Sequence, residues 1–127
     1  MKRSHLNLLS FSFILAITLS CGKSLPDLTD IDLAVWQQDR NGCLGKRAAM
    51  ETSLEKQKNR LLGLSEAQIG TLLGRPDDNE LYKRNQKFYH YAIQASKNCG
   101  GVPVGTTPKE LVIRFTAMGI ANEVSIE

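Results

Sequence analysis

The apolar residues in the middle of the chain recur at the spacing of a helix. Residues 46–62 contain neither Gly nor Pro, and their apolar side chains form one stripe, which consists of Met50, Leu54 and Leu61. The polar positions between them include oppositely charged pairs of the kind found on a wet helix face. This pattern predicts one helix over 46–62.

A second, shorter helix is predicted directly after Gly63. Ser65 and Gln68 have the S-x-x-Q spacing of a capping box, so this helix begins at Glu66, and Gly74 stands where a helix ends. A helix of about eight residues is too short to be stable alone. It must pack on a sheet through its apolar residues, which are Ile69, Leu72 and Leu73.

The last third of the chain alternates in the manner of β-strands. Three segments show this period, with Gly-containing loops between them: 86–93, 111–115 and 122–126. In the first segment, Tyr89 and Tyr91 share one face with Ile93. The order of elements predicts an α+β fold, a two-layer sandwich of two helices on a three-stranded antiparallel meander.

A lead segment and a turn precede the first predicted helix. Residues 27–39 begin with acidic side chains, as helix N-termini prefer, and carry a short apolar patch around Trp36, the only tryptophan. Trp36 is interpreted as a core residue, and the alternative is an anchor for a partner. Residues 40–45 contain Asn-Gly and a second glycine, and they predict a turn.

The N-terminus has the pattern of an export signal. Basic residues at positions 2 and 3 precede an uncharged apolar stretch over 6–20, which is shorter than the roughly 20 residues of a membrane span. Small Ser20 stands before Cys21, which resembles a bacterial lipobox, where the cysteine is acylated and becomes the new N-terminus. The alternatives are an ordinary secretory signal with a chance cysteine and an uncleaved anchor.

The chain therefore divides into three predicted parts: a cleaved signal peptide over 1–20, a lipidated tether over 21–29 and a single domain over 30–127. The tether contains small and polar residues and a proline, which suit a spacer between a bilayer and a domain. The acylated Cys21 would make membrane lipid the first partner, because two or three acyl chains give a stable anchor.

Composition and charge narrow the function classes. The chain has 127 residues, of which 42% are hydrophobic and 23% charged, as is typical of one small globular domain. The formal net charge of +3 includes two basic residues of the predicted signal, so the remaining chain counts 14 basic against 13 acidic residues. A net charge of +1 creates no strong field, and no nucleic-acid partner is expected.

Cys43 and Cys99 remain as a pair if Cys21 carries lipid. An exported chain meets an oxidising compartment, and both cysteines lie beside Gly-containing loop sequence that can bring them together. We predict a disulfide between them, with two free thiols as the alternative. They have no CxxC spacing, and His90 is the only histidine outside the signal, so neither a metal nor a cofactor is expected.

No constellation of residues predicts an enzyme. His90 lies in the middle of a predicted strand, where a strand-face role is more common than catalysis. Asp77 and Asp78 are adjacent and follow a helix stop, so they are interpreted as turn residues. The glycine-rich loop after Asn98 precedes no predicted helix and has no well-placed lysine, which argues against a phosphate site.

The order of these features resembles a known family. A lipobox precedes a helix, then the run L-x-G-L-S-x-x-Q-I-x-x-L-L-G-x-P-D from Leu61 to Asp77, a Tyr-rich strand and a closing hairpin. This order resembles the SmpA/OmlA/BamE-like small lipoproteins, whose glycine, short helix and Leu-Gly-x-Pro core matches Gly63 through Pro76. It looks most like Bacteroidetes members, in the features Trp36, Asp39, Gly42-Cys43, NELYKRNQKFYHY and VIRFTAMGIANEVSIE.

The resemblance implies a non-enzymatic lipoprotein, anchored in the outer membrane and facing the periplasm. Its best-described members are accessory subunits of the β-barrel assembly machine, so envelope proteins are the implied partners. The same fold also serves secreted inhibitors of hydrolases, so an inhibitor or ligand-binding module is the alternative function. The candidate partner-binding residues are Trp36, Arg40, Tyr89 and Tyr91.

Overall fold

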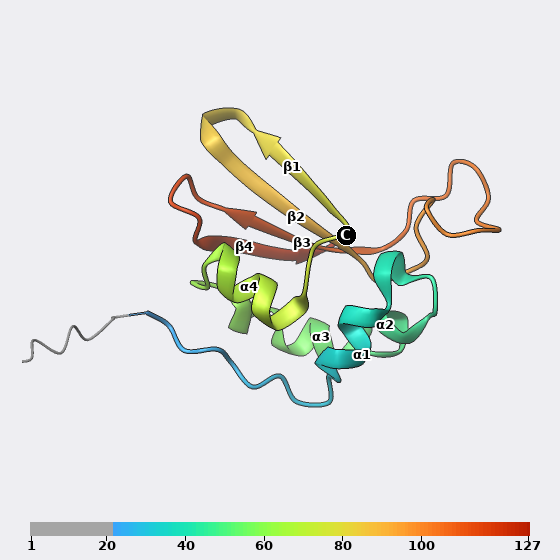
Figure 1. The fold of residues 1–127 in the computed structure, drawn as a ribbon, viewed down its shortest axis with the longest axis horizontal. Helices are drawn as coiled ribbons and strands as arrows, with labels where there is room; N and C mark the ends of the chain where they lie inside the picture. The colour runs from blue at the N-terminus through green and yellow to red at the C-terminus, as the bar shows by residue number, and fades with distance from the viewer. Residues whose placement is uncertain (1–21) are drawn as a thin grey trace, which may run out of the picture.

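The helices of this protein lie on one side of a four-stranded antiparallel sheet, which makes the fold α+β (Figure 1). The structure is a computed structural model that describes residues 22–127. The predicted signal peptide over 1–20 and the predicted lipidation site, Cys21, lie outside the described residues.

Four short α-helices are followed by the strands of the sheet. The helices are α1 (Leu33–Gln38), α2 (Lys46–Ala49), α3 (Glu51–Gln57) and α4 (Glu66–Leu73), joined by the 3-10 turns η1 (Arg40–Gly42) and η2 (Lys58–Leu61). The strands are β1 (Asp78–Tyr82), β2 (Gln86–Ala92), β3 (Glu110–Phe115) and β4 (Ala121–Ile126), with the 3-10 turn η3 (Lys83–Asn85) between the first two. They pair in the order β1-β2-β3-β4, so each strand neighbours the next one along the chain.

The prediction for α4 is confirmed at both ends and on its buried face. The Ser65 hydroxyl accepts from the Gln68 N–H at 3.2 Å, and the Gln68 side chain accepts from the Ser65 N–H at 2.9 Å, which completes the capping box. Gly74 ends the helix with a φ of 79°. Its apolar residues, Ile69, Leu72 and Leu73, are all buried.

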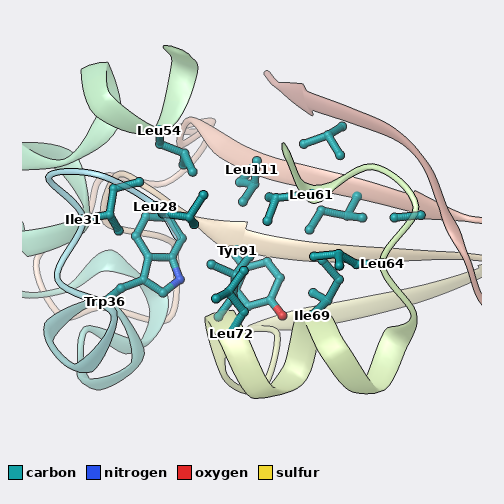
Figure 2. Close-up of a cluster of buried hydrophobic side chains, with 14 of the residues drawn as sticks. Leu28, Ile31, Trp36, Leu54, Leu61, Leu64, Ile69, Leu72, Tyr91 and Leu111 are labelled. Carbon is teal, nitrogen blue, oxygen red and sulfur yellow. The ribbon is translucent and has the colours of Figure 1, made fainter. Parts of the chain in front are cut away.

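The core lies between the helices and the inner face of the sheet (Figure 2). Across that face, Tyr89 pairs with Ile113, and Ile113 pairs with Val124. The inward residues of β3 and β4 include three members of this cluster and one, Ile126, that is partly buried and packs against it: Ile113, Phe115, Val124 and Ile126. The helix layer contributes leucines such as Leu54 and Leu61, so the predicted burial of α4 on the sheet agrees with the observed core.

The single helix predicted over 46–62 is instead three short pieces. The backbone leaves helical geometry at Met50, with ψ at 0°, and again at Gln57, with ψ at −3°. At the second break, the Gln57 side chain bonds both backbone groups of Thr29, at 2.7 Å and 2.6 Å. Tertiary contacts therefore override a helix preference that composition alone indicated.

A fourth strand, β1, was absent from the sequence prediction. Its residues, Asp78–Tyr82, are all exposed, so it has no buried face to impose an alternation of apolar and polar positions. Three of the five are Asp, Asn or Glu, types that are depleted in strands. β1 is an edge strand that pairs with β2 alone, and no local signal in the sequence marked it.

The lead before α1 lies against the domain rather than extending freely from it. Leu28 and Ile31 are buried in the core. The Lys23 ammonium donates to the carbonyls of Arg60 and Leu62 at 2.8 Å and 2.5 Å. The Gln68 side chain also donates to the Lys23 carbonyl. The part of the predicted tether that the structure describes is thus docked on the helix layer as far back as Lys23.

Candidate functional site

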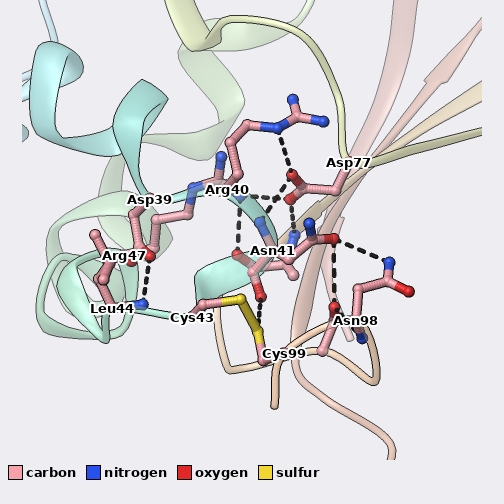
Figure 3. Close-up of a disulfide and its surroundings, with 11 residues drawn as sticks. Asp39, Arg40, Asn41, Cys43, Leu44, Arg47, Asp77, Asn98 and Cys99 are labelled. Carbon is pink, nitrogen blue, oxygen red and sulfur yellow. Dashed lines mark hydrogen bonds and ion pairs between the residues drawn. A yellow bond between two sulfur atoms is a disulfide. The ribbon is translucent and has the colours of Figure 1, made fainter.

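The turn after α1 and the loop after β2 meet at one end of the sheet, which we call the disulfide end (Figure 3). It comprises residues 39–47, Asp77 and residues 92–99. The sulfur atoms of Cys43 and Cys99 lie 1.99 Å apart and join the two segments, in the pairing that the sequence predicted. The cysteines are 56 positions apart in the sequence, so the bond closes a long loop.

Asn41 and Gly42 allow the two segments to approach closely. Asn41 has a φ of 58°, and its side-chain oxygen accepts from the Ser96 hydroxyl at 3.3 Å and the Asn98 amide at 3.2 Å. Gly42 has a φ of 66°, and a Cβ atom there would lie 2.7 Å from the Gln94 carbonyl oxygen. The predicted Asn-Gly turn is therefore the point where the backbone of the η1 turn presses against the chain after β2.

Asp77 is the centre of the polar network at this end. Its carboxylate accepts from the Arg47 guanidinium at 2.5 Å, from the Asn41 N–H at 3.0 Å and from the Ala92 N–H at 2.9 Å. Arg40 adds an ion pair, with its Nε 3.5 Å from an Asp77 oxygen. The Asp77 side chain is only 6% exposed. Asp77 does lie in the bend before β1, as the sequence predicted, but its side chain is buried and paired, while Asp78 is the first residue of β1 and not a turn residue.

Arg47 is completely buried and connects three elements. Besides Asp77, it donates to the Trp36 carbonyl at 2.9 Å and to the Ala92 carbonyl at 3.1 Å. Its guanidinium carbon lies 4.8 Å from the centre of the Trp36 ring, a cation–π geometry. Asp39, also fully buried, accepts from the backbone N–H of Arg47 at 2.9 Å. A buried charge is tolerated only when it is paired in this way.

The sequence contains one signal for the burial of Arg47. Arg47 lies three residues before Met50, on the stripe that continues through Leu54. A charged residue in line with an apolar stripe requires a buried counter-charge. The identity of that counter-charge, Asp77, has no local signature, because it lies 30 residues further along the chain.

A pocket of about 270 Å³ opens beside the disulfide end. Its acidic lining residues are Asp77, Asp78 and Glu110, and Lys97 is its basic one. Its remaining lining residues carry amide, hydroxyl or apolar groups: Asn41, Ser96, Asn98, Thr106, Thr107, Ala92 and Pro108. Since Asp77 is already paired with Arg47, Asp78 and Glu110 are the carboxylates that a bound molecule would meet.

A second hollow, of about 430 Å³, runs beside β1. Residues 75–79 and Tyr89 line it. The Tyr89 hydroxyl donates to a Glu66 oxygen at 3.1 Å, and the Lys87 ammonium lies 2.6 Å from the same oxygen. Burial first, and then the hydrogen bond to Glu66, raise the pKa of Tyr89, while the bond to Glu66 raises the pKa of Lys87. Tyr89 therefore keeps its proton at neutral pH.

Two of the four predicted partner-binding residues are core residues instead. Trp36 and Tyr91 are fully buried, with ring centres 6.4 Å apart. The Tyr91 hydroxyl donates to the Gly74 carbonyl at 2.8 Å, and burial raises the pKa of Tyr91 well above its usual value. Neither side chain can contact a partner at the surface, so the candidate partner role is wrong for both, while the interpretation of Trp36 as a core residue is confirmed. Their size and apolar rings are used to fill the core.

Arg40 and Tyr89 remain at the surface. The Arg40 side chain is 40% exposed and donates to the carbonyls of Arg75 and Pro76, two residues that line the hollow beside β1. Tyr89 lines the same hollow. The structure therefore brings these two predicted residues to one side of the molecule, next to the exposed edge of the sheet.

His90 lies on the opposite face of β2 from Tyr89 and Tyr91, between two carboxylates. Its Nδ1 is 3.0 Å from a Glu110 oxygen, and its Nε2 is 3.7 Å from a Glu80 oxygen. Within residues 22–127, no group of three or more His, Cys, Asp or Glu side chains could hold a metal ion. The position on a sheet face matches the strand-face role predicted for His90.

Comparison with protein-family models, curated proteins and solved structures found no match to this chain. Among the helices of residues 22–127, none has the length and apolar character needed to cross a bilayer.

Proposed function

We propose that this protein is a lipid-anchored lipoprotein of the bacterial outer membrane that faces the periplasm and binds other envelope proteins. It acts as a non-enzymatic scaffold, the role implied by the resemblance to the SmpA/OmlA/BamE-like lipoproteins, whose members serve in β-barrel assembly. Acylated Cys21 is its anchor. The close approach of Cys43 and Cys99 supports an oxidising compartment, because a pair held this close forms a disulfide there.

The proposal includes the finer family arrangement of two helices and three strands. In it, residues 46–61 and α4 supply the two helices, and β2, β3 and β4 supply the meander. This chain adds α1 before the helices and β1 at the edge of the sheet. The addition of β1 matters for function, since it replaces the edge of β2 with a new edge.

The exposed edge of β1 is the observation that carries the scaffold role. All five of its residues are exposed, and within the described chain its outer edge pairs with nothing. Leu81 is 69% exposed, and its neighbour Tyr82 is also exposed. The Tyr82 ring packs edge-to-face against the Phe88 ring, with the ring centres 6.0 Å apart. An extended segment of a partner can add to such an edge through backbone hydrogen bonds and place side chains in the adjoining hollow.

The acidic side chains of β1 indicate which residues a partner segment would carry. Asp78 and Glu80 stand on the same face of β1, two positions apart, and neither forms an ion pair with a Lys or Arg of the described residues. Like charges opposing each other across a strand pair are unfavourable, whereas basic residues opposite them are favourable. We therefore expect an extended partner segment that carries Lys or Arg. The Asp77 network holds the start of β1 in place before binding, which lowers the entropy cost of association.

Affinity capture from detergent-solubilised envelopes tests this role. The wild-type protein should retain β-barrel assembly subunits, and Glu80→Lys combined with Tyr82→Ser should reduce their recovery about tenfold or more, as loss of a binding hot spot does. Val104→Ser is the matched control, because Val104 is fully exposed in the loop before β3. Equal recovery by the β1 variant and the control, or recovery of no assembly subunit, would contradict the proposal.

The pocket of about 270 Å³ favours a second candidate, an inhibitor or ligand-binding module. Asp78 and Glu110 would accept from an amino group, while Asn98 and Thr107 would bond polar groups of a small ligand or of an inserted side chain. Ligand binding to the folded state raises thermal stability. A polar amine that stabilises the wild type but not Asp78→Asn, or the capture of a soluble hydrolase, would favour this function over the scaffold role.

A further inference from the structure

The docked lead leaves little freedom between the domain and the proposed anchor. Only residue 22 separates Lys23 from Cys21, so their Cα atoms are at most about 7 Å apart. Lys23 is held by the carbonyls of Arg60 and Leu62, and the Gln68 side chain holds its own carbonyl. An acyl chain on Cys21 must therefore enter the bilayer beside this corner of the domain. A free tether of nine residues would impose no such constraint.

The turn between β3 and β4 lies at the same corner. The Gly63 N–H donates to the Ala121 carbonyl at 2.8 Å, and the Glu66 N–H donates to the Gly119 carbonyl at 3.1 Å. The Lys23 side chain passes over Gly63: a Cβ atom added to Gly63 would lie 3.5 Å from the Cδ atom of Lys23. Figure 1 shows the blue lead leaving the domain at the end where this turn lies. The exit of the chain and the 116–120 turn thus form one surface.

This surface combines exposed apolar and basic side chains. Met118 is 90% exposed, and Ile120 and Leu25 are also exposed large hydrophobic residues. Lys23 and Arg60 are exposed and use backbone carbonyls as partners, with no carboxylate partner among the described residues. The neighbouring carboxylate of Glu66 is taken by Lys87 at 2.6 Å. Apolar tips ringed by basic groups suit the interface of an anionic bilayer, where both contribute to binding.

We infer that the docked lead fixes the orientation of the domain on the membrane, with the surface formed by Lys23, Leu25, Arg60, Met118 and Ile120 in contact with phospholipid. This inference rests on the proposed anchor at Cys21. It goes beyond the scaffold role, because it states which face meets the lipid. The pocket at the disulfide end then faces away from the bilayer, since the loop before β3 lies at the other end of the molecule (Figure 1).

Tryptophan quenching by brominated phospholipids tests the orientation. The full-length lipoprotein is reconstituted into vesicles of phosphatidylethanolamine with a minority of phosphatidylglycerol, brominated on the acyl chains. Met118→Trp introduces a reporter in the membrane surface, and Val104→Trp is the control in the distant loop. The native Trp36 is fully buried, so the wild type supplies a constant background. The M118W reporter should be quenched and shifted to the blue, while the V104W reporter should remain at its aqueous emission.

A second variant distinguishes a loss of orientation from a loss of membrane attachment. Lys23→Glu with Arg60→Glu, in the M118W background, should lose the quenching while the protein still floats with the vesicles. The matched control reverses two exposed lysines elsewhere, Lys46→Glu with Lys97→Glu, and should keep it. Flotation of the M118W variant that keeps Lys23 and Arg60, with its reporter unquenched, would overturn the orientation and leave the anchor intact. A protein that carries no lipid and does not float would overturn the proposed lipoprotein itself, and the orientation with it.

Discussion

The two ends of the sheet are held together by different chemistry. At the α4 end, Ile69 and Leu73 pack on Ile113 and Phe115 in a core of apolar side chains. At the disulfide end, a buried Arg47–Asp77 pair and a disulfide join three segments. Apolar packing tolerates many partners of similar size, whereas a buried ion pair requires one particular partner. The α4 end can therefore accept gradual substitution, whereas the disulfide end loses its structure when one member of the pair is lost.

Loss of Arg47 should give the largest destabilisation. Arg47→Met would leave the buried carboxylate of Asp77 with only the more distant and partly exposed Arg40 as a counter-charge. It would also leave the Trp36 and Ala92 carbonyls without this donor, for a cost of about 3–5 kcal/mol. Urea unfolding of the Cys21→Ala form, which lacks the proposed acylation site, measures this effect. Adding Asp77→Asn to Arg47→Met should recover part of the loss. Strict additivity of the two changes would mean that the pair is not coupled.

Leu72→Ala tests the apolar end. Removing a buried side chain from α4 should cost about 2–5 kcal/mol, because the site can collapse only partly around the void. Gln68→Ala on the same helix is the control, and loss of its capping contact should cost only about 0.5 kcal/mol. If urea melts showed equal small effects, α4 would not depend on the sheet for its stability.

Removal of the disulfide shows how much the covalent bond contributes to stability at the disulfide end, for comparison with the Arg47–Asp77 ion pair. Cys43→Ser combined with Cys99→Ser should cost about 2–4 kcal/mol, because an unfolded chain freed of this long loop gains entropy. Peptide mapping without reductant should first recover one species that contains both cysteines. Alkylation of both thiols in protein purified from the envelope, without reductant, would show that the bond does not form.

Substitution of Tyr91 should change the free energy of unfolding least at neutral pH, and it should alter how stability depends on pH in alkaline solution. Tyr91→Phe loses the bond to the Gly74 carbonyl, at a cost of about 0.5–1.5 kcal/mol. Burial raises the pKa of Tyr91 above the ordinary value of 10.0, so its contribution is fully present below pH 10 and declines as the pH rises further. The variant should therefore lose less stability than the wild type above pH 10. Parallel alkaline curves would contradict this.

The same contrast explains which parts of the molecule could be predicted. The capping box of α4 and the Gly74 stop lie within ten residues of sequence. The apolar periodicity and the turn-forming residues were therefore sufficient to predict this helix. The Asp77 network joins groups 15 to 37 residues apart, and nothing local to Asp77 marks its side chain as buried. β1 escaped prediction for the opposite reason, since a fully exposed edge strand needs no apolar pattern. Of the predicted partner residues, burial removed Trp36 and Tyr91, because large aromatics serve cores as well as interfaces.

The position of the disulfide along the chain also determines how the protein would respond to a protease. The bond closes a ring that runs from Cys43 to Cys99, and both β3 and β4 lie outside it. A cut within the ring, at exposed Lys97 for example, leaves the two fragments covalently joined. A cut in the exposed loop at Val104 instead leaves β3 and β4 on a separate peptide, retained only by their sheet pairing and by buried residues such as Ile113. A single nick in the loop at 100–107 therefore divides the core into two unlinked chains, whereas a nick between Cys43 and Cys99 does not.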